Sequence, residues 1–114
     1  MAGSISEVTD TSFQAEVIES ETPILVDFWA PWCAPCLALA PLLESGAAAR
    51  VGQVVLAKVD VDLCPTLWRR YEVSTVPAVK AIRNGEVVAE FVGIQSPQTV
   101  ERFFDELVAA HARA

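Results

Sequence analysis

The order of β-rich and helix-favouring segments along the chain is the feature that most constrains its fold. Short β-rich runs alternate with longer Leu- and Ala-rich runs, and Asn84-Gly85 separates the last two β-rich segments. An Asn-Gly pair between two such segments is typical of a two-residue antiparallel hairpin. Strands that alternate with helices and end in a hairpin predict an α/β fold, in which helices cover one mixed sheet.

The spacing of apolar residues, together with the residues that usually begin or end helices and strands, locates the individual elements. The expected strands lie near residues 5–8 and over residues 24–30, 54–59, 78–83 and 86–92. The expected helices cover residues 12–19, 34–50, 65–71 and 97–111. Asp10, Thr11 or Ser12 is expected to cap the first helix. Pro41 is expected to interrupt the second helix, and Ser96 to cap the last one ahead of Pro97.

Composition predicts one folded domain over residues 1–114. Apolar residues make up 53% of the chain, which argues against disorder. The net charge of −7 argues against nucleic acid or anionic lipid as a partner. No apolar stretch approaches the roughly 20 residues of a membrane helix, and residues 1–7 lack the features of a secretory signal. We therefore expect a soluble, cytoplasmic protein.

The spacing of the cysteines is the strongest chemical signal. The chain has Cys33, Cys36 and Cys64, an odd number that argues against a structural disulfide framework. Cys33 lies where a buried strand is expected to pass into a helix, so unpaired N–H groups and the helix dipole would stabilise its thiolate. Residues 1–49 contain no Lys or Arg, so this stabilisation would come mainly from the backbone. Cys36 lies near one helical turn further on, within reach of the first sulfur.

A bridge between Cys33 and Cys36 would be easy to open, because so short a loop adds only about 2 kcal/mol of stability through loop entropy. Pro35 between them fits a first helical turn. Reversible redox chemistry is therefore the favoured interpretation. A metal half-site and an inert thiol pair are the alternatives, and the metal site lacks ligands because only Cys64 and His111 remain, on separate segments.

Asp27 is a second unusual residue, because it lies inside the apolar run 24–30. Burial would raise the pKa of this carboxyl group unless it is paired, and a buried acid that titrates near neutral pH is a candidate proton acceptor. Lys58, the one basic residue of the strand expected over 54–59, is its candidate partner. A buried salt bridge without catalytic role and an outward-facing carboxylate are the alternatives.

Residues 26–36, Val-Asp-Phe-Trp-Ala-Pro-Trp-Cys-Ala-Pro-Cys, closely resemble the active-site segment of the thioredoxin family. The resemblance continues in order, with matching spacing, over nearly the whole chain. It includes Pro41, Lys58-Val59-Asp60-Val61-Asp62, Thr75-Val76-Pro77, Asn84-Gly85-Glu86 and Val92-Gly93. It implies the thioredoxin fold, a central mixed sheet of about five strands flanked by about four helices.

The resemblance implies a thiol–disulfide oxidoreductase that reduces protein disulfides. Cys33 would attack a target disulfide, and Cys36 would resolve the mixed disulfide. Asp27 would take the proton from Cys36 through water, and Lys58 would tune Asp27. The peptide bond before Pro77 would be cis. The apolar docking surface would consist of Trp32, Val61, Val76, Pro77, Gly93 and Ile94.

The chain departs from the common family pattern at several positions. Ala34 stands where the commonest motif has Gly, and Leu37 where many relatives have Lys; Ala34 and Pro35 would tune the redox potential. No charge lies between the cysteines, which favours a reductase over an oxidase. Cys64 is interpreted as a half-buried inert thiol, with a redox or glutathionylation switch as the alternative. Trp68 and Tyr71 are expected to be packing residues, and His111 to be solvated.

The family also implies the partners. The protein would bind no cofactor or metal and would receive electrons from NADPH through a thioredoxin reductase. Its other partners would be disulfide-containing proteins, and we expect a monomer. Two alternatives stay open, a disulfide oxidase or isomerase and a thioredoxin-fold binding module or co-chaperone with little redox turnover.

Overall fold

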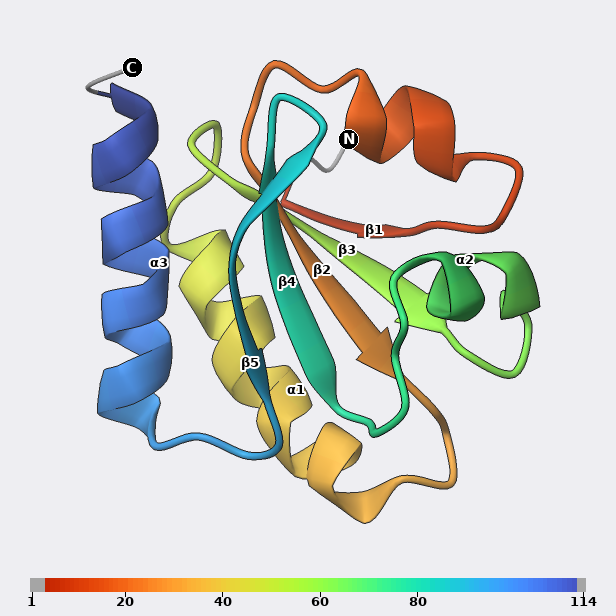
Figure 1. The fold of residues 1–114 in the computed structure, drawn as a ribbon. Helices are drawn as coiled ribbons and strands as arrows, with labels where there is room; N and C mark the ends of the chain where they lie inside the picture. The colour runs from red at the N-terminus through yellow and green to blue at the C-terminus, as the bar shows by residue number, and fades with distance from the viewer. Residues whose placement is uncertain (1–3, 113–114) are drawn as a thin grey trace.

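The computed structural model describes residues 4–112. Residues 1–3, part of the segment in which no signal is expected, lie outside the described residues, as do residues 113–114. The strands are β1 (Ile5–Glu7), β2 (Ile24–Trp29), β3 (Val55–Asp60), β4 (Ala78–Arg83) and β5 (Glu86–Val92). The helices are η1 (Gln14–Ile18), α1 (Ala34–Ala48), α2 (Pro65–Arg70) and α3 (Pro97–Ala112). The predicted element order is confirmed (Figure 1).

The five strands form one mixed sheet in the order β1-β3-β2-β4-β5. β1, β3 and β2 are parallel, whereas β4 runs antiparallel to both β2 and β5. The hairpin is confirmed, because Asn84 and Gly85 both have positive φ, 53° and 81°, as a two-residue turn of the primed type requires. The sheet therefore has the predicted α/β architecture, with β2 at its centre.

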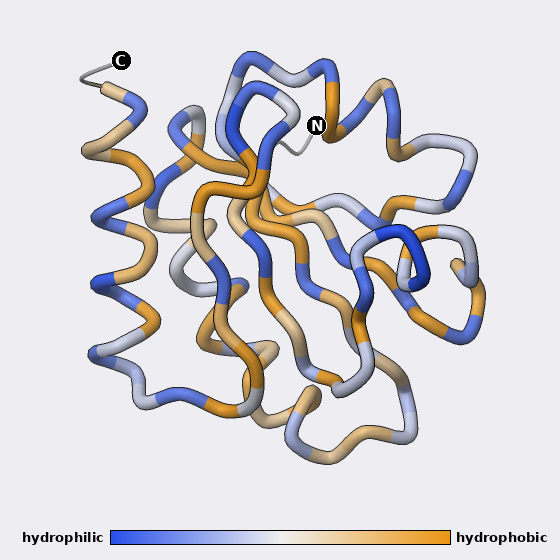
Figure 2. Tube along the Cα trace, viewed as in Figure 1, coloured by the Kyte–Doolittle hydropathy of each residue, from blue (hydrophilic) through white to orange (hydrophobic). Residues whose placement is uncertain are grey.

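Helices cover both faces of the sheet, so β2 is buried along its length. One core contains Leu25 together with Leu43 of α1 and Phe104 of α3. The other core contains Phe28 together with Val17 of η1 and Leu67 of α2. Figure 2 shows the apolar strands enclosed between these layers. No helix within residues 4–112 is long and apolar enough to cross a membrane.

The predicted cap of the first helix is wrong, and Asp10 caps a different helix. The segment forms only a short π-helical turn, η1, whose first residue follows Phe13 without a side-chain cap. The Asp10 carboxylate instead accepts hydrogen bonds from the backbone N–H groups of Thr66 (3.3 Å) and Leu67 (3.1 Å) at the start of α2. Because Cys64, the cap residue of α2, makes no side-chain cap hydrogen bond, this distant acceptor satisfies N–H groups that would otherwise lack a partner.

Two further predictions concern prolines. Pro41 does not interrupt α1, which is assigned as one helix from Ala34 to Ala48. The proline removes the N–H that would bond to the carbonyl group of Leu37, and both residues are exposed, so water can satisfy that carbonyl group. At α3 the predicted cap is confirmed, because Ser96 Oγ accepts a hydrogen bond from Thr99 N–H at 3.1 Å.

The contact between α1 and α3 depends on Gly46. A Cβ atom added at this position would overlap the ring of Phe104. Arg50 closes the same contact, because its guanidinium lies 5.0 Å from the centroid of the Phe104 ring and bonds to Glu101 (2.8 Å) and Asp105 (2.7 Å) on α3. The two helices are therefore packed too closely for any side chain at residue 46.

We expect Gly46→Ala to lower the free energy of unfolding by about 1–3 kcal/mol, the usual cost of overpacking. A loss of stability is informative, because replacing glycine with alanine at an exposed helix position usually raises stability by about 1 kcal/mol. Urea denaturation measures the change. Ser45→Ala, on the exposed side of the same turn, is the control and should stay within about 0.5 kcal/mol of wild type. A Gly46→Ala protein as stable as wild type would contradict the close packing.

Candidate active site

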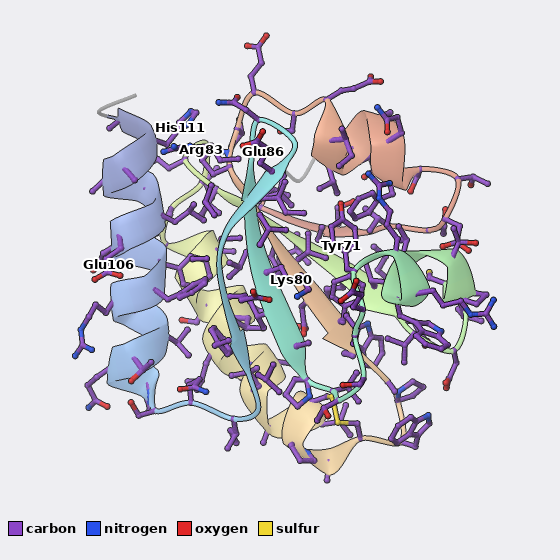
Figure 3. The ribbon with its side chains drawn as sticks, viewed as in Figure 1. Tyr71, Lys80, Arg83, Glu86, Glu106 and His111 are labelled. Carbon is purple, nitrogen blue, oxygen red and sulfur yellow. A yellow bond between two sulfur atoms is a disulfide. The ribbon has the colours of Figure 1, made fainter. Side chains whose placement is uncertain are left out.

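Cys33 and Cys36 form a disulfide at the start of α1, just after the end of β2 (Figure 3). Their Cα atoms are 5.3 Å apart. Cys33 is the N-cap residue of α1, and its Sγ accepts a hydrogen bond from Cys36 N–H at 3.2 Å. The sulfur thus takes the place that a serine or aspartate oxygen takes at an ordinary helix start, where backbone N–H groups favour negative charge. Ala34 and Pro35 form the exposed first turn.

Both cysteines lie in a small apolar cluster with Ala30, and partly buried Val61 and Val76 pack against it. Cys33 is 5% exposed and Cys36 2% exposed, so Cys33 is the more accessible of the two. Cys33 Sγ also lies 3.7 Å from the carbonyl oxygen of Val76. A partner that reaches this disulfide therefore meets Cys33 beside the backbone of Val76.

Asp27 is buried in the middle of β2, the strand that precedes the disulfide. Its side chain is 2% exposed, which excludes the outward-facing alternative. Burial raises the pKa of Asp27 to about 7, although the positive charge of Lys58 lowers it in part and the negative charge of Glu44 raises it. Asp27 Oδ1 has no hydrogen-bond partner within residues 4–112. The carboxyl group therefore titrates near neutral pH, as a proton acceptor requires.

Lys58 lies opposite Asp27 in the β2–β3 register, but its ion pair is with another residue. Lys58 Nζ is 3.0 Å from Glu44 Oε2 on α1 and 4.9 Å from the centroid of the Trp29 ring. The predicted pairing with Asp27 is therefore wrong as a salt bridge, although the charge of Lys58 still acts on Asp27. Glu44 is more exposed than Asp27, so its carboxylate is less costly to keep ionised.

The segment around Pro77 lies beside the disulfide. The Val76–Pro77 peptide bond is cis, as the resemblance implied. The carbonyl group of Pro77 accepts a hydrogen bond from Gly93 N–H at 2.9 Å, and Gly93 has a φ of 85° that favours glycine. Val76, Pro77 and Gly93 are thus held together next to Cys33. Ile94 is exposed immediately after Gly93.

A groove of about 490 Å³ runs from Val76 and Trp32 toward α2. Trp32 is 68% exposed, and its Nε1–H donates a hydrogen bond to Asp62 Oδ2 at 2.9 Å. The residues that line the groove are Trp32, Val61, Asp62, Trp68, Val73, Ser74, Thr75 and Val76. Three of the predicted docking residues, Trp32, Val61 and Val76, are therefore brought together in one groove.

The sequence did not predict a docking role for other residues that line this groove, among them Trp68 and Asp62. Trp68 packs against the core as predicted, but it also lines the groove. Asp62, which belongs to the segment 58–62 that resembles the family, also lines the groove and bonds to Trp32. Spacing from the cysteines gives no signal for these positions, because Asp62 follows β3 and Trp68 lies on α2, and only the fold brings both to the groove that Trp32 lines.

The remaining candidates lie away from the disulfide. Cys64 is fully buried rather than half-buried, its Sγ contacts the carbonyl oxygen of Val8 at 3.7 Å, and burial raises the pKa of its thiol. This environment favours the inert interpretation. His111 is half-buried near the end of α3, so the prediction of a solvated side chain is wrong. No three His, Cys, Asp or Glu side chains within residues 4–112 form a group that could hold a metal ion.

Comparisons with known proteins give consistent matches. A family model described as Thioredoxin matches residues 4–106. Thioredoxin C-2 of Corynebacterium nephridii is 43% identical over 106 residues, which are 93% of this chain and 98% of that protein. Mitochondrial thioredoxin of Mus musculus is 51% identical over 96 residues, which are 84% of this chain but only 58% of that protein. The bifunctional thioredoxin reductase/thioredoxin of Mycobacterium leprae (strain TN) is 40% identical over 107 residues, which are 94% of this chain and 23% of that protein.

Proposed function

Since this chain belongs to the thioredoxin family, we propose that Cys33 is its attacking thiolate, Cys36 its resolving thiol and Asp27 the acceptor of the Cys36 proton. The protein is a thiol–disulfide oxidoreductase that reduces protein disulfides. The observation that carries the assignment of roles is the position of Cys33 Sγ at the N-cap of α1, bonded to Cys36 N–H.

The reaction has two exchanges. In the reduced protein the Cys33 thiolate attacks one sulfur of the target disulfide, the target S–S bond breaks, and the released thiolate takes up a proton. Cys36 then loses its proton to Asp27 through a water molecule and attacks Cys33 Sγ. The mixed disulfide breaks, and the second target sulfur leaves as a thiolate that is protonated. The target gains two electrons and two protons, and the Cys33–Cys36 disulfide forms.

Docking of the target uses the apolar surface around the disulfide. Trp32, Val61 and Val76 line the groove, and Pro77 and Gly93 hold the neighbouring segment in place. An extended target backbone would lie along this segment, with its cysteine beside Cys33, and Ile94 would extend the surface. Lys58 acts through its charge on Asp27. Ala34 and Pro35, in the first turn of α1, would tune the potential of the pair.

Recycling is the remaining part of the proposal. Exchange between thiols and disulfides needs no bound cofactor, so the oxidised pair would be reduced by a thioredoxin reductase that uses NADPH. The fusion of the two activities in the bifunctional relative of Mycobacterium leprae supports this partner. We propose a monomeric, cytoplasmic protein that transfers electrons to disulfide targets and so contributes to cell redox homeostasis.

Coupled turnover tests the proposal. With NADPH, a purified thioredoxin reductase and insulin, we expect NADPH oxidation that depends on this protein. A parallel assay with dithiothreitol in place of NADPH and the reductase separates the two parts. Insulin reduction in the dithiothreitol assay but not in the assay with NADPH and the reductase would contradict the reductase partner. No acceleration in either assay would favour a binding module. A Cys33–Cys36 potential above the glutathione couple would favour an oxidase or isomerase instead.

A further inference from the structure

Building on the proposed function, we infer that Trp68 is a specificity-determining residue of the target groove. Trp32 and Trp68 line the same groove, and Trp68 contributes an aromatic surface from α2. This arrangement selects target segments that carry an aromatic or large aliphatic side chain, and no acidic one, close to the attacked cysteine.

The groove is continuous with the reacting sulfur. Val76 lines it, and the carbonyl oxygen of the same residue lies 3.7 Å from Cys33 Sγ. Trp32 also lines it and directly precedes Cys33 in sequence. A target whose cysteine reaches Cys33 therefore places its neighbouring residues in this groove. Val61 and Val73 add further apolar surface to the groove.

Trp68 is held firmly enough to act as a fixed wall. Its side chain is partly buried and packs against the core that contains Leu67. Its backbone N–H bonds to the carbonyl oxygen of Cys64 at 3.3 Å, and its own carbonyl oxygen accepts from Val73 N–H at 2.9 Å. The Arg69 guanidinium lies 5.3 Å from the centroid of the Trp68 ring. A rigid aromatic surface gives a large apolar contact at low entropic cost, as in the residues that dominate protein interfaces.

The charge of the groove determines the second property of the target segment, the absence of an acidic side chain. Of the described residues that line the groove, Asp62 alone is charged. Its carboxylate is exposed and bonds to Trp32 Nε1, so it stays beside the exposed indole. The whole chain carries a net charge of −7, which adds to the negative potential met by a target. An acidic target residue beside Trp32 is therefore repelled by Asp62, whereas a neutral apolar residue meets the two indoles and three valines that line the groove.

Peptide substrates test this inference. We would use cyclic peptides closed by one disulfide and identical except at one residue next to a cysteine, which is Phe, Ser or Glu, placed in turn on either side. The measured quantity is kcat/KM with dithiothreitol as reductant. For the wild type we expect a preference for Phe over Ser of roughly tenfold at one of these positions, the size usual for a single apolar contact. We expect Trp68→Ala to reduce that ratio to about twofold or less, and Trp68→Phe to retain most of it.

The design separates specificity from folding and from catalysis. The Phe-to-Ser ratio is measured within one protein sample, so partial unfolding of Trp68→Ala does not change it. Leu63→Ala removes an exposed apolar side chain that does not line the groove and should leave the ratio unchanged. Asp62→Asn, whose carbonyl oxygen can still accept from Trp32, should reduce the discrimination between Ser and Glu.

Three results would overturn the inference. They are equal rates for the Phe and Ser peptides in the wild type, an unchanged ratio in Trp68→Ala, and undiminished rejection of Glu in Asp62→Asn. In each case normal insulin reduction by the wild type would leave the proposed function standing. If the wild type reduced neither the peptides nor insulin, both the function and the inference would fail.

Discussion

Replacing Cys33 with serine is expected to lower the rate of insulin-disulfide reduction by about a thousandfold or more, the scale seen when a catalytic nucleophile is removed. A serine hydroxyl at the N-cap of α1 can still accept the hydrogen bond from Cys36 N–H, so the helix start is preserved. The loss would therefore report the missing sulfur nucleophile rather than an unfolded helix. Insulin turbidity with dithiothreitol measures the rate.

Cys36→Ser should fail differently, and the difference assigns the two roles. Cys33 can still attack the target, but the mixed disulfide has no second thiol to resolve it, so a covalent adduct with the target should accumulate in intact-mass spectra. Cys64→Ser is the matched control, because Cys64 is fully buried away from the pair and should be dispensable for turnover. Retained turnover in Cys33→Ser, or adducts in Cys33→Ser rather than in Cys36→Ser, would contradict the proposed order of attack.

Local signals in the sequence were enough for the parts of the fold that depend on neighbouring residues. The Asn84-Gly85 turn and the Ser96 cap needed only a few adjacent residues, and both are confirmed. The cysteine spacing likewise predicted a disulfide at a helix start. In these cases the interactions that determine the structure are between residues only a few positions apart in the sequence.

Contacts between distant segments could not be predicted in this way. Asp10 caps α2, more than 50 residues away, because tertiary packing brings it to N–H groups without a partner. Lys58 pairs with Glu44 of α1, although strand register places it opposite Asp27. Trp68 packs against the core as predicted, and only the folded structure shows that it also lines the groove. In each case a polar or aromatic group had several possible partners, and the fold selected one of them.

Asp27→Asn is expected to stabilise the oxidised protein at pH 8. The pKa of Asp27 is about 7 in the folded protein, against an ordinary value of 3.8. Below about pH 4 the carboxyl group is neutral in both states and costs nothing. As pH rises from about 4 to 7, the unfolded chain ionises first, so the wild type loses stability that reaches about 4 kcal/mol above pH 7. Asparagine avoids this loss, although its buried amide costs about 1–3 kcal/mol if it lacks partners.

We therefore expect a net gain of roughly 2 kcal/mol for Asp27→Asn at pH 8, which shrinks and then reverses as pH falls toward 4. Urea denaturation of the oxidised protein across this range measures the difference, and Asp62→Asn, at an exposed carboxylate, is the matched control. The same substitution should slow the resolving step at pH 7 and prolong the mixed disulfide, because Cys36 loses its proton acceptor. A gain in stability without slower resolution would show that Asp27 is a buried carboxylate with no part in proton transfer. A stability difference independent of pH would instead contradict its raised pKa, because only an ionisation that differs between the folded and unfolded states makes that difference vary with pH.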